Sequence, residues 1–249
     1  MDMIITTGKH SYIVDKIDAT IEVGSIVFIP ENKTWHMITA PGIMTPVVGD
    51  EIEEAVKVST AEALVEALAA GGFVSVESNI DAPTAILIEK DATINLNGKE
   101  ISVKEDTVGD GVFKVTNGIL TIEGEGTING VGKNDYSMAI WADGGDVIIN
   151  SGNFTNVGAG EHDHYDLIYV KNGGYVEING GTFECQTPRW TLNSHNTLPG
   201  TIVVKGGTFI NYNPAESYTD ENNENPSNFV PSGYKVVEES EGVFVVVAE

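Results

Sequence analysis

A pattern repeated four times is the feature that most restricts how this 249-residue chain can fold. Each copy places an alternating apolar pair, a turn of small residues and a large apolar residue in the same order. Strand-like alternation repeated every 26 to 29 residues is typical of one rung of a β-solenoid. The copies are ILTIEGEGTI (119–128), DVIINSGNFT (146–155), YVEINGGTFE (175–184) and TIVVKGGTFI (201–210).

The repeat predicts where its apolar and amide side chains lie. The last large residues of the copies, Ile128, Phe154, Phe183 and Phe209, are expected to stack inside at the strand spacing of about 4.8 Å. Asn150 and Asn179, which precede the glycine turns, are expected to stack at a corner. On the preceding strand of each copy, Ile148 and Val203 are expected to point outward, where exposed apolar side chains would indicate a partner surface.

Each rung should contain three strands. The strands that begin successive rungs are VFKV (112–115), MAIW (138–141) and LIYV (167–170), and the pattern then degrades at LNSHN (192–196). The expected fold class is therefore all-β, a parallel β-helix with three strands per rung.

The two ends of the predicted solenoid have their own signals. Ser59 and Glu62 have capping-box spacing, which predicts a helix that ends at Gly71-Gly72 and buries Val58, Leu64, Val65 and Leu68. This helix is expected to cover the open end of the solenoid, with an ordinary connecting helix as the alternative. At the other end, FVPSGYKVVEESEGVFVVVAE predicts a covering hairpin that turns at Glu241-Gly242.

Residues 1–57 are expected to form a small separate β domain, because short β-rich runs broken by prolines replace the repeat there. Residues 49–58 would connect this domain to the second one, residues 58–249. The N-terminus lacks a basic region followed by an apolar run, and no segment approaches the length of a membrane span. We therefore expect a protein made in the cytoplasm without a signal peptide and without a membrane partner.

Charge and cysteine content exclude further classes. The chain has 37 acidic and 13 basic residues, a net charge of −24, so a nucleic-acid partner is not expected. Its single cysteine, Cys185, has no intrachain partner and is expected to be a small structural residue rather than a reactive thiol. No motif for a nucleotide or other cofactor is present, and no cofactor is expected.

Polar and aromatic residues gather in the loops that join one rung to the next. Counting back from the first strand of each rung stacks Asp135, His164 and Trp190 in one column, and Asn134, Asp163 and Arg189 in the next. A candidate ligand-binding corner follows, with no catalytic residue assigned. Its residues are Asp135, Tyr136, His162, Asp163, His164, Tyr165, Arg189 and Trp190.

Three chemistries remain open for this corner. A glycosidase needs two carboxyl groups about 5–10 Å apart, for which Asp135, Glu161, Asp163 and Asp166 are available. A lyase needs a base beside a bound cation. A glycan-binding patch needs only Trp190, Tyr136 or Tyr165 to stack on a sugar face, with acids and amides to hydrogen-bond the sugar's hydroxyls. His162 and His164 lack a second ligand pair at fixed spacing, so no metal is expected.

The segment VSTAEALVEALAAGGFVSVESNI, followed by rungs that end in GGTF, resembles pectate-lyase-like right-handed parallel β-helix domains over about residues 58–213. Enzymes of that superfamily usually carry an Asp cluster with a nearby Arg or Lys on a strand face. Here only Arg189 lies near acids. The resemblance therefore implies the fold more strongly than an activity.

The layout of a short β domain before a β-helix also resembles bacteriophage fibre and spike proteins. The tail GGTFINYNPAE…NFVPSGYKVVE is similar to segments of β-helix proteins of gut bacteria and their phages, including capsid head fibres. This resemblance implies a virion surface protein anchored by residues 1–57. The implied partners are phage capsid proteins, further copies in a homo-oligomer (a trimer by family expectation) and host or mucosal glycans. A polysaccharide lyase or hydrolase is the alternative.

Overall fold

The chain forms two compact units, Met1–Ile52 and Glu53–Glu249. The computed structural model describes residues 3–7, 10–14, 26–29, 34–40, 43–46, 55–103, 111–131, 137–158, 164–218 and 226–249, with backbone only before residue 55 and at 218 and 226–227. Among these residues, no helix combines the length and apolar character that a membrane-spanning helix requires.

The first unit contains one antiparallel sheet with the strand order β2-β1-β3-β4-β5. Its strands are β1 (Met3–Thr7), β2 (His10–Val14), β3 (Ile26–Ile29), β4 (Thr34–Ala40) and β5 (Ile43–Pro46). The division between the units falls inside the segment 49–58 that was expected to connect them. The last residues of that segment pair with the second unit, because β6 (Val56–Val58) lies parallel to β7 (Gly72–Val76).

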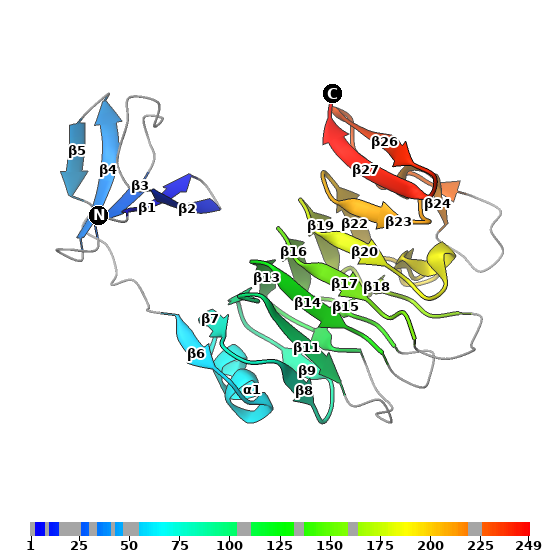
Figure 1. Ribbon diagram of the computed structural model, residues 1–249, viewed down its shortest axis with the longest axis horizontal. Helices are drawn as coiled ribbons and strands as arrows, with labels where there is room; N and C mark the ends of the chain where they lie inside the picture. The colour runs from blue at the N-terminus through cyan, green and yellow to red at the C-terminus, as the bar shows by residue number, and fades with distance from the viewer. Residues whose placement is uncertain are drawn as a thin grey trace. The chain divides into compact units, whose positions relative to one another are not determined.

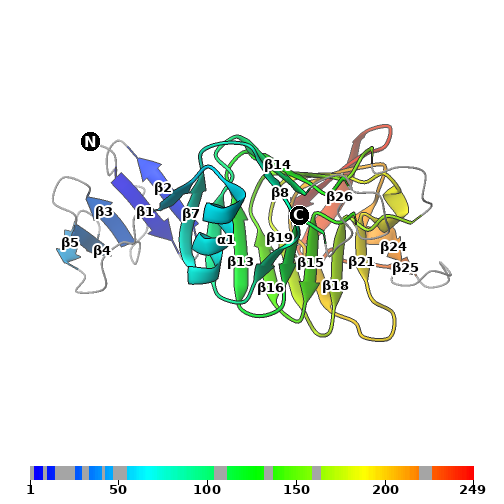
Figure 2. The ribbon, with the colours of Figure 1, turned by 90° about the horizontal axis from the view of Figure 1, so that it is seen from below.

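The second unit is a parallel β-solenoid, which confirms the predicted fold class (Figures 1 and 2). Each rung contributes one strand to each of three sheets, and strands of successive rungs pair in parallel. Sheet 1 contains, in spatial order, β22 (Thr201–Val204), β19 (Tyr175–Ile178), β16 (Asp146–Ile149), β13 (Ile119–Glu123), β10 (Ala92–Asn95), β7 and β6.

Sheets 2 and 3 complete the rungs. Sheet 2 contains β26 (Tyr234–Ser240), β27 (Val243–Ala248), β23 (Thr208–Ile210), β20 (Thr182–Glu184), β17 (Asn153–Thr155), β14 (Gly126–Asn129), β11 (Lys99–Val103) and β8 (Ile80–Ala82). Sheet 3 contains β21 (Leu192–Ser194), β18 (Ile168–Lys171), β15 (Ile140–Asp143), β12 (Phe113–Val115) and β9 (Ile86–Ile88). The degraded segment LNSHN thus still supplies a strand, β21.

The predicted aromatic column forms inside the solenoid. Phe154 and Phe183 stack with ring centroids 5.0 Å apart, and Phe183 and Phe209 stack at 4.8 Å. Ile128 lies in register with Phe154 on the neighbouring strand, and all four side chains are at most 1% exposed. A glycine two residues before each Phe permits this corner: Gly181, for example, has a φ of 100°, a backbone conformation that disfavours other residues.

One helix covers the N-terminal end of the solenoid, as predicted. α1 (Ala61–Ala70) packs against β6, β7, β8 and β9, which together come from all three sheets (Figure 1). The predicted cap residue was wrong: Thr60, not Ser59, is the N-cap, and its hydroxyl accepts a hydrogen bond from the Ala63 amide. The expected burial of Val65 was also wrong, because Ala67 faces the core and Val65 is 43% exposed.

The predicted C-terminal hairpin is present. β26 and β27 pair antiparallel around Glu241-Gly242, and Gly242 has a φ of 73°. β27 then pairs antiparallel with β23, so the hairpin continues sheet 2 at its C-terminal edge. The described residues also include a short pair, β24 (Ser217–Tyr218) with β25 (Pro226–Ser227), and the 3-10 helices η1 (Pro188–Trp190) and η2 (Pro214–Glu216).

At sheet 1 the structure confirms the predicted asparagine stack at the corner and corrects the predicted exposure of an apolar residue on the outer face. Asn179 donates a hydrogen bond from Nδ2 to Asn150 Oδ1 at 3.1 Å, which confirms the asparagine stack. Ile148 lies on the outer face in register with Thr121 and Glu177, but it is only 8% exposed. The expectation that Ile148 contributes to an exposed apolar surface is therefore wrong, because side chains of neighbouring rungs shield residues on a sheet face.

Candidate functional site

The outer face of sheet 3 carries a row of large polar and aromatic side chains. Strand alternation directs Ile140 and Ala142 into the core, where both are fully buried, and directs Trp141 to the outer face. The parallel register places the equivalent residue of each rung beside it. The row, here called the sheet 3 strip, consists of Lys114, Trp141, Tyr169 and Asn193.

Aromatic and cationic groups contact one another along this strip. The Lys114 ammonium nitrogen lies 3.9 Å from the Trp141 ring centroid, a cation–π distance. The Trp141 and Tyr169 rings are tilted with centroids 5.9 Å apart. The His195 ring centroid lies 6.3 Å from the Tyr169 ring centroid. Trp141 is 8% exposed, whereas Tyr169 is half-buried. Tyr169 is therefore the ring of the strip that is more open to a ligand.

The carboxylate beside the strip is already engaged. Asp143 lies 3.6 Å from the Lys114 ammonium group and accepts a hydrogen bond from the Asn172 side-chain amide. A carboxylate held in this way is suited to fixing the position of Lys114 over Trp141.

The loop corner predicted from the sequence lies at the start of the sheet 3 strands. The His164 imidazole stacks on the Trp190 indole with centroids 4.0 Å apart and planes 20° apart, as the counted columns predicted for this pair. The Arg189 guanidinium carbon lies 4.7 Å from the centroid of the same indole. Trp190 is only 5% exposed. A sugar ring could stack on the face that His164 occupies only if the imidazole moved.

Asp166 connects this corner to the sheet 3 strip. Its Oδ1 lies 3.3 Å from His164 Nε2 and accepts a hydrogen bond from Asn193 Nδ2 at 2.9 Å. Asp166 and Asn193 are 8% and 7% exposed. A chain of contacts therefore runs from Trp190 through His164 and Asp166 to Asn193, which lies in register with Tyr169.

A buried asparagine holds the corner loops together. The Asn156 side chain is fully buried, and its Nδ2 donates to the carbonyl oxygens of Ser137 at 2.8 Å and Asp166 at 3.1 Å. Its Oδ1 accepts a hydrogen bond from the Gln186 amide at 2.8 Å. These partners belong to three different loop segments. Asn156 therefore sets the spacing of the loops that carry the candidate corner.

Cys185 and Tyr165 have structural contacts at the same corner. Tyr165 is 2% exposed, and its backbone amide donates to the Thr187 hydroxyl at 2.9 Å. The Cys185 thiol donates to the Tyr165 carbonyl oxygen at 3.0 Å. Burial raises the pKa of the thiol to about 12, so it stays protonated at neutral pH. The structural interpretation of Cys185 is confirmed.

The remaining predicted site residues, Asp135, Tyr136, His162 and Asp163, lie outside the described residues, as does Glu161. The sheet 3 strip was not among the residues predicted from the sequence, although alternation in MAIW and LIYV places Trp141 and Tyr169 outward. Asn156 was not predicted either, because it stands outside the repeat pattern. Among the residues whose side chains are described, no group of three or more His, Cys, Asp or Glu residues is arranged to hold a metal ion.

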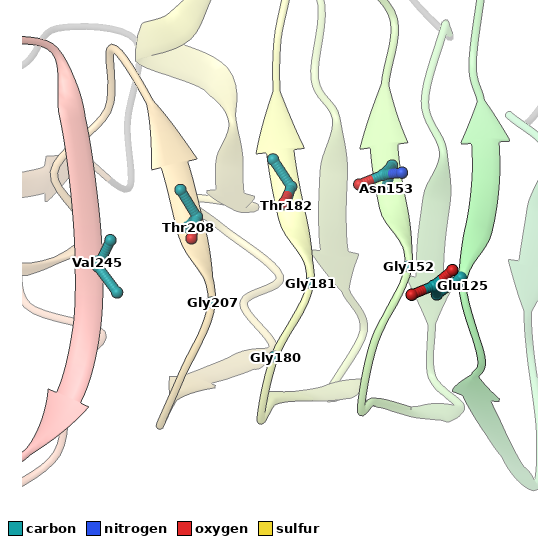
Figure 3. A pocket seen from close by; sticks show the side chains of 9 residues that line it. All are labelled: Glu125, Gly152, Asn153, Gly180, Gly181, Thr182, Gly207, Thr208 and Val245. Atoms are coloured by element: carbon teal, nitrogen blue, oxygen red, sulfur yellow. The ribbon is translucent and has the colours of Figure 1, made fainter.

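A second surface feature is an open hollow of about 490 Å³ on the outer face of sheet 2 (Figure 3). Glycines and Glu125, which lies in the turn between β13 and β14, form the corner side of the hollow, and outward side chains of successive strands form the rest. These strand side chains are Asn153, Thr182, Thr208 and Val245. The amide protons of Thr182 and Thr208 bond to glycine carbonyl oxygens of the preceding rung, so this hollow presents mainly side-chain hydroxyl and amide groups.

No protein family, no curated protein and no solved structure matches this chain. The class of protein is therefore defined by its own geometry: a two-unit protein whose second unit is a capped parallel β-solenoid with an aromatic and charged strip on one face.

Proposed function

We propose that this chain is a structural surface protein that adheres to carbohydrate. The N-terminal unit serves as the attachment module, and the solenoid displays the binding face. The interior of the solenoid supports a structural role, because its repeated Phe, Gly and Asn residues all take part in stacking or in tight corners.

The sheet 3 strip is the observation that carries the adhesive part of the proposal. Aromatic rings present an apolar face that suits the C–H face of a sugar, and neighbouring amide and charged groups suit its hydroxyls. Tyr169 provides the half-buried ring, between Trp141 on one side and His195 on the other. Asn193 lies in register with Tyr169 on the same outer face, and Lys171 lies two residues after Tyr169 on the same strand.

The proposed setting is a virus particle, where the chain would be a phage head fibre or capsid-decoration protein. Support comes from the resemblance of the layout to fibre proteins and from the division into two compact units. In this setting the partners are a capsid protein, further copies of the chain and host or mucosal glycans. The net charge of −24 would keep many copies soluble at high local concentration.

A polysaccharide lyase or hydrolase is the second candidate. The described carboxylates near the strip argue for the adhesive role, because Asp143 pairs with Lys114 and Asp166 with His164 and Asn193. The enzymatic alternative depends on Asp135 and Asp163 together with Arg189. Release of reducing ends or unsaturated sugars from a glycan panel, abolished by Asp163→Ala and Arg189→Ala, would replace the adhesive proposal with the enzymatic one.

Glycan binding tests the adhesive proposal directly. The full chain is screened against immobilised acidic and neutral glycans, and Tyr169→Ala is expected to weaken binding about tenfold because one stacking face is lost. Tyr175→Ala is a matched control, since Tyr175 is also a half-buried tyrosine on an outer strand face, in sheet 1. Binding to none of the glycans, or equal binding by both variants, would refute the assignment to the strip.

Particle attachment tests the anchoring role. The solenoid unit without residues 1–52 is expected to stay folded and to lose attachment to capsids. Deletion up to residue 57 is less suitable, because it would remove two residues of β6. Attachment by a folded chain that lacks residues 1–52 would overturn the assignment of the first unit as the anchor.

A further inference from the structure

The last strand of sheet 2 has an edge that suits pairing with another strand. β26 pairs with β27 on one side, and no described strand pairs with it on the other. Five of its seven residues are exposed, namely Lys235, Val237, Glu238, Glu239 and Ser240. An exposed strand edge presents unpaired N–H and C=O groups and is a template for an additional strand.

Apolar side chains lie on the outer face beside this edge. Val237 is 39% exposed and lies opposite Val245 of β27, and Val247, 37% exposed, lies opposite Lys235. The other face of the hairpin contacts the solenoid core, against which Tyr234 packs. The hairpin therefore presents an unpaired edge together with an adjoining apolar outer face.

We propose that β26 pairs antiparallel with β26 of a second copy of this chain, around a two-fold axis at Val237. In this register Val237 lies opposite the partner subunit's Val237, which joins the apolar outer faces. Lys235 lies opposite Glu239 of the partner subunit, and symmetry repeats this pair, so two opposite-charge pairs flank the axis. The two copies of sheet 2 then form one continuous sheet.

The order of charged residues along β26 favours a second copy of this chain as the partner, and it favours this register. Moving the axis to Glu238 would place Glu238 opposite the partner subunit's Glu238, and like charges directly opposite are unfavourable. Moving it to Val236 would place Lys235 opposite the partner subunit's Val237 and leave the lysine without its acidic partner. The pairing of β26 with β27 shifts register between Glu238 and Ser240, so Glu239 lies at the end of the regular part of this strand.

The test uses the full chain and measures its mass in solution by light scattering over a concentration series. We expect a dimer for the unmodified chain. Lys235→Glu and Glu239→Lys are each expected to raise the dimer dissociation constant about tenfold, since each change replaces both charge pairs with repulsion. The double variant, Lys235→Glu with Glu239→Lys, restores the pairs in reversed order and should restore the dimer.

Lys57→Glu is the matched control, because Lys57 is an exposed lysine on the edge strand β6 and should leave the dimer unchanged. A monomer at every concentration, a trimer, or a dimer that the single variants do not weaken would overturn the proposal. Failure of the double variant to restore the dimer would overturn the register. The inference is independent of the proposed adhesion, because Tyr169→Ala should leave the dimer intact.

Discussion

Asn156→Ala should destabilise the solenoid more than Asn150→Ala, the same substitution in the Asn150–Asn179 stack at the sheet 1 corner. The substitution removes three hydrogen bonds, of 2.8, 2.8 and 3.1 Å, from a fully buried side chain. It leaves the carbonyl oxygens of Ser137 and Asp166 and the amide of Gln186 without this partner. Each of these bonds stabilises the folded state by about 1 kcal/mol net, and a buried group left unsatisfied costs up to about 3 kcal/mol.

The expected loss is therefore about 3–5 kcal/mol in the free energy of unfolding. For a unit of this size, each kcal/mol lowers the melting temperature by about 2–4 °C. Urea denaturation followed by circular dichroism measures the free energy, and a thermal scan measures the shift. Hydrogen exchange at the Gln186 amide should also become faster, because that amide loses its acceptor.

Asn150→Ala is the control for the same chemical change. Asn150 accepts one side-chain hydrogen bond, from Asn179, and is only half-buried, so we expect a loss of about 1 kcal/mol. Equal losses for the two variants, or a loss below about 1 kcal/mol for Asn156→Ala, would refute the conclusion that Asn156 holds three loop segments together.

Three further perturbations test the packing and the titrating groups. Phe183→Ala should cost about 3–5 kcal/mol in urea denaturation, because it opens a cavity between two stacked rings; a cost near that of an exposed site would contradict the column. The Cys185 thiol should resist alkylation at pH 8 until the protein is unfolded. Its pKa is raised to about 12, so the stability it contributes is full below about pH 8.5 and is lost as the pH rises toward 12. Glu177→Gln should cost less than about 1 kcal/mol at neutral pH, because its ion pair with Lys205 is partly exposed. Partial burial raises the pKa of Glu177, but the lysine and the hydrogen-bond donors lower it by more, so the net pKa is lowered. The stability that Glu177 contributes is therefore present at neutral pH and disappears as the pH falls through the lowered pKa. The free energy of unfolding, measured from pH 7 down to acid pH, should show that loss only in the unmodified chain.

The repeat carried most of the fold prediction because its information is local. Strand alternation and the glycine turns are visible in each copy, and equal spacing brings the copies into register without further knowledge. The stacked Phe154, Phe183 and Phe209 rings and the Asn150–Asn179 pair follow directly. The stacking of His164 on Trp190 was predictable for the same reason, since both are counted from a strand of known register.

Burial at the outer surfaces was harder to predict, because it depends on what lies on the neighbouring rung. Ile148 was expected to be exposed and is covered, whereas Val65 was expected to be buried and is exposed. Trp190 was considered as a sugar-stacking ring, but His164 occupies one of its faces. Whether a side chain is accessible is set by contacts between rungs, which a single copy of the repeat does not describe.

The sequence by itself determined the solenoid, its three strands per rung, its helical cap and its terminal hairpin, because periodicity and turn residues are properties of short segments. Only the tertiary structure brought Lys114, Trp141 and Tyr169 into one row, and only it joined Asp166 to Asn193. It also gave Asn156 its three partners. These side chains come from different rungs and loops, and their contacts arise when the rungs stack at the strand spacing of about 4.8 Å.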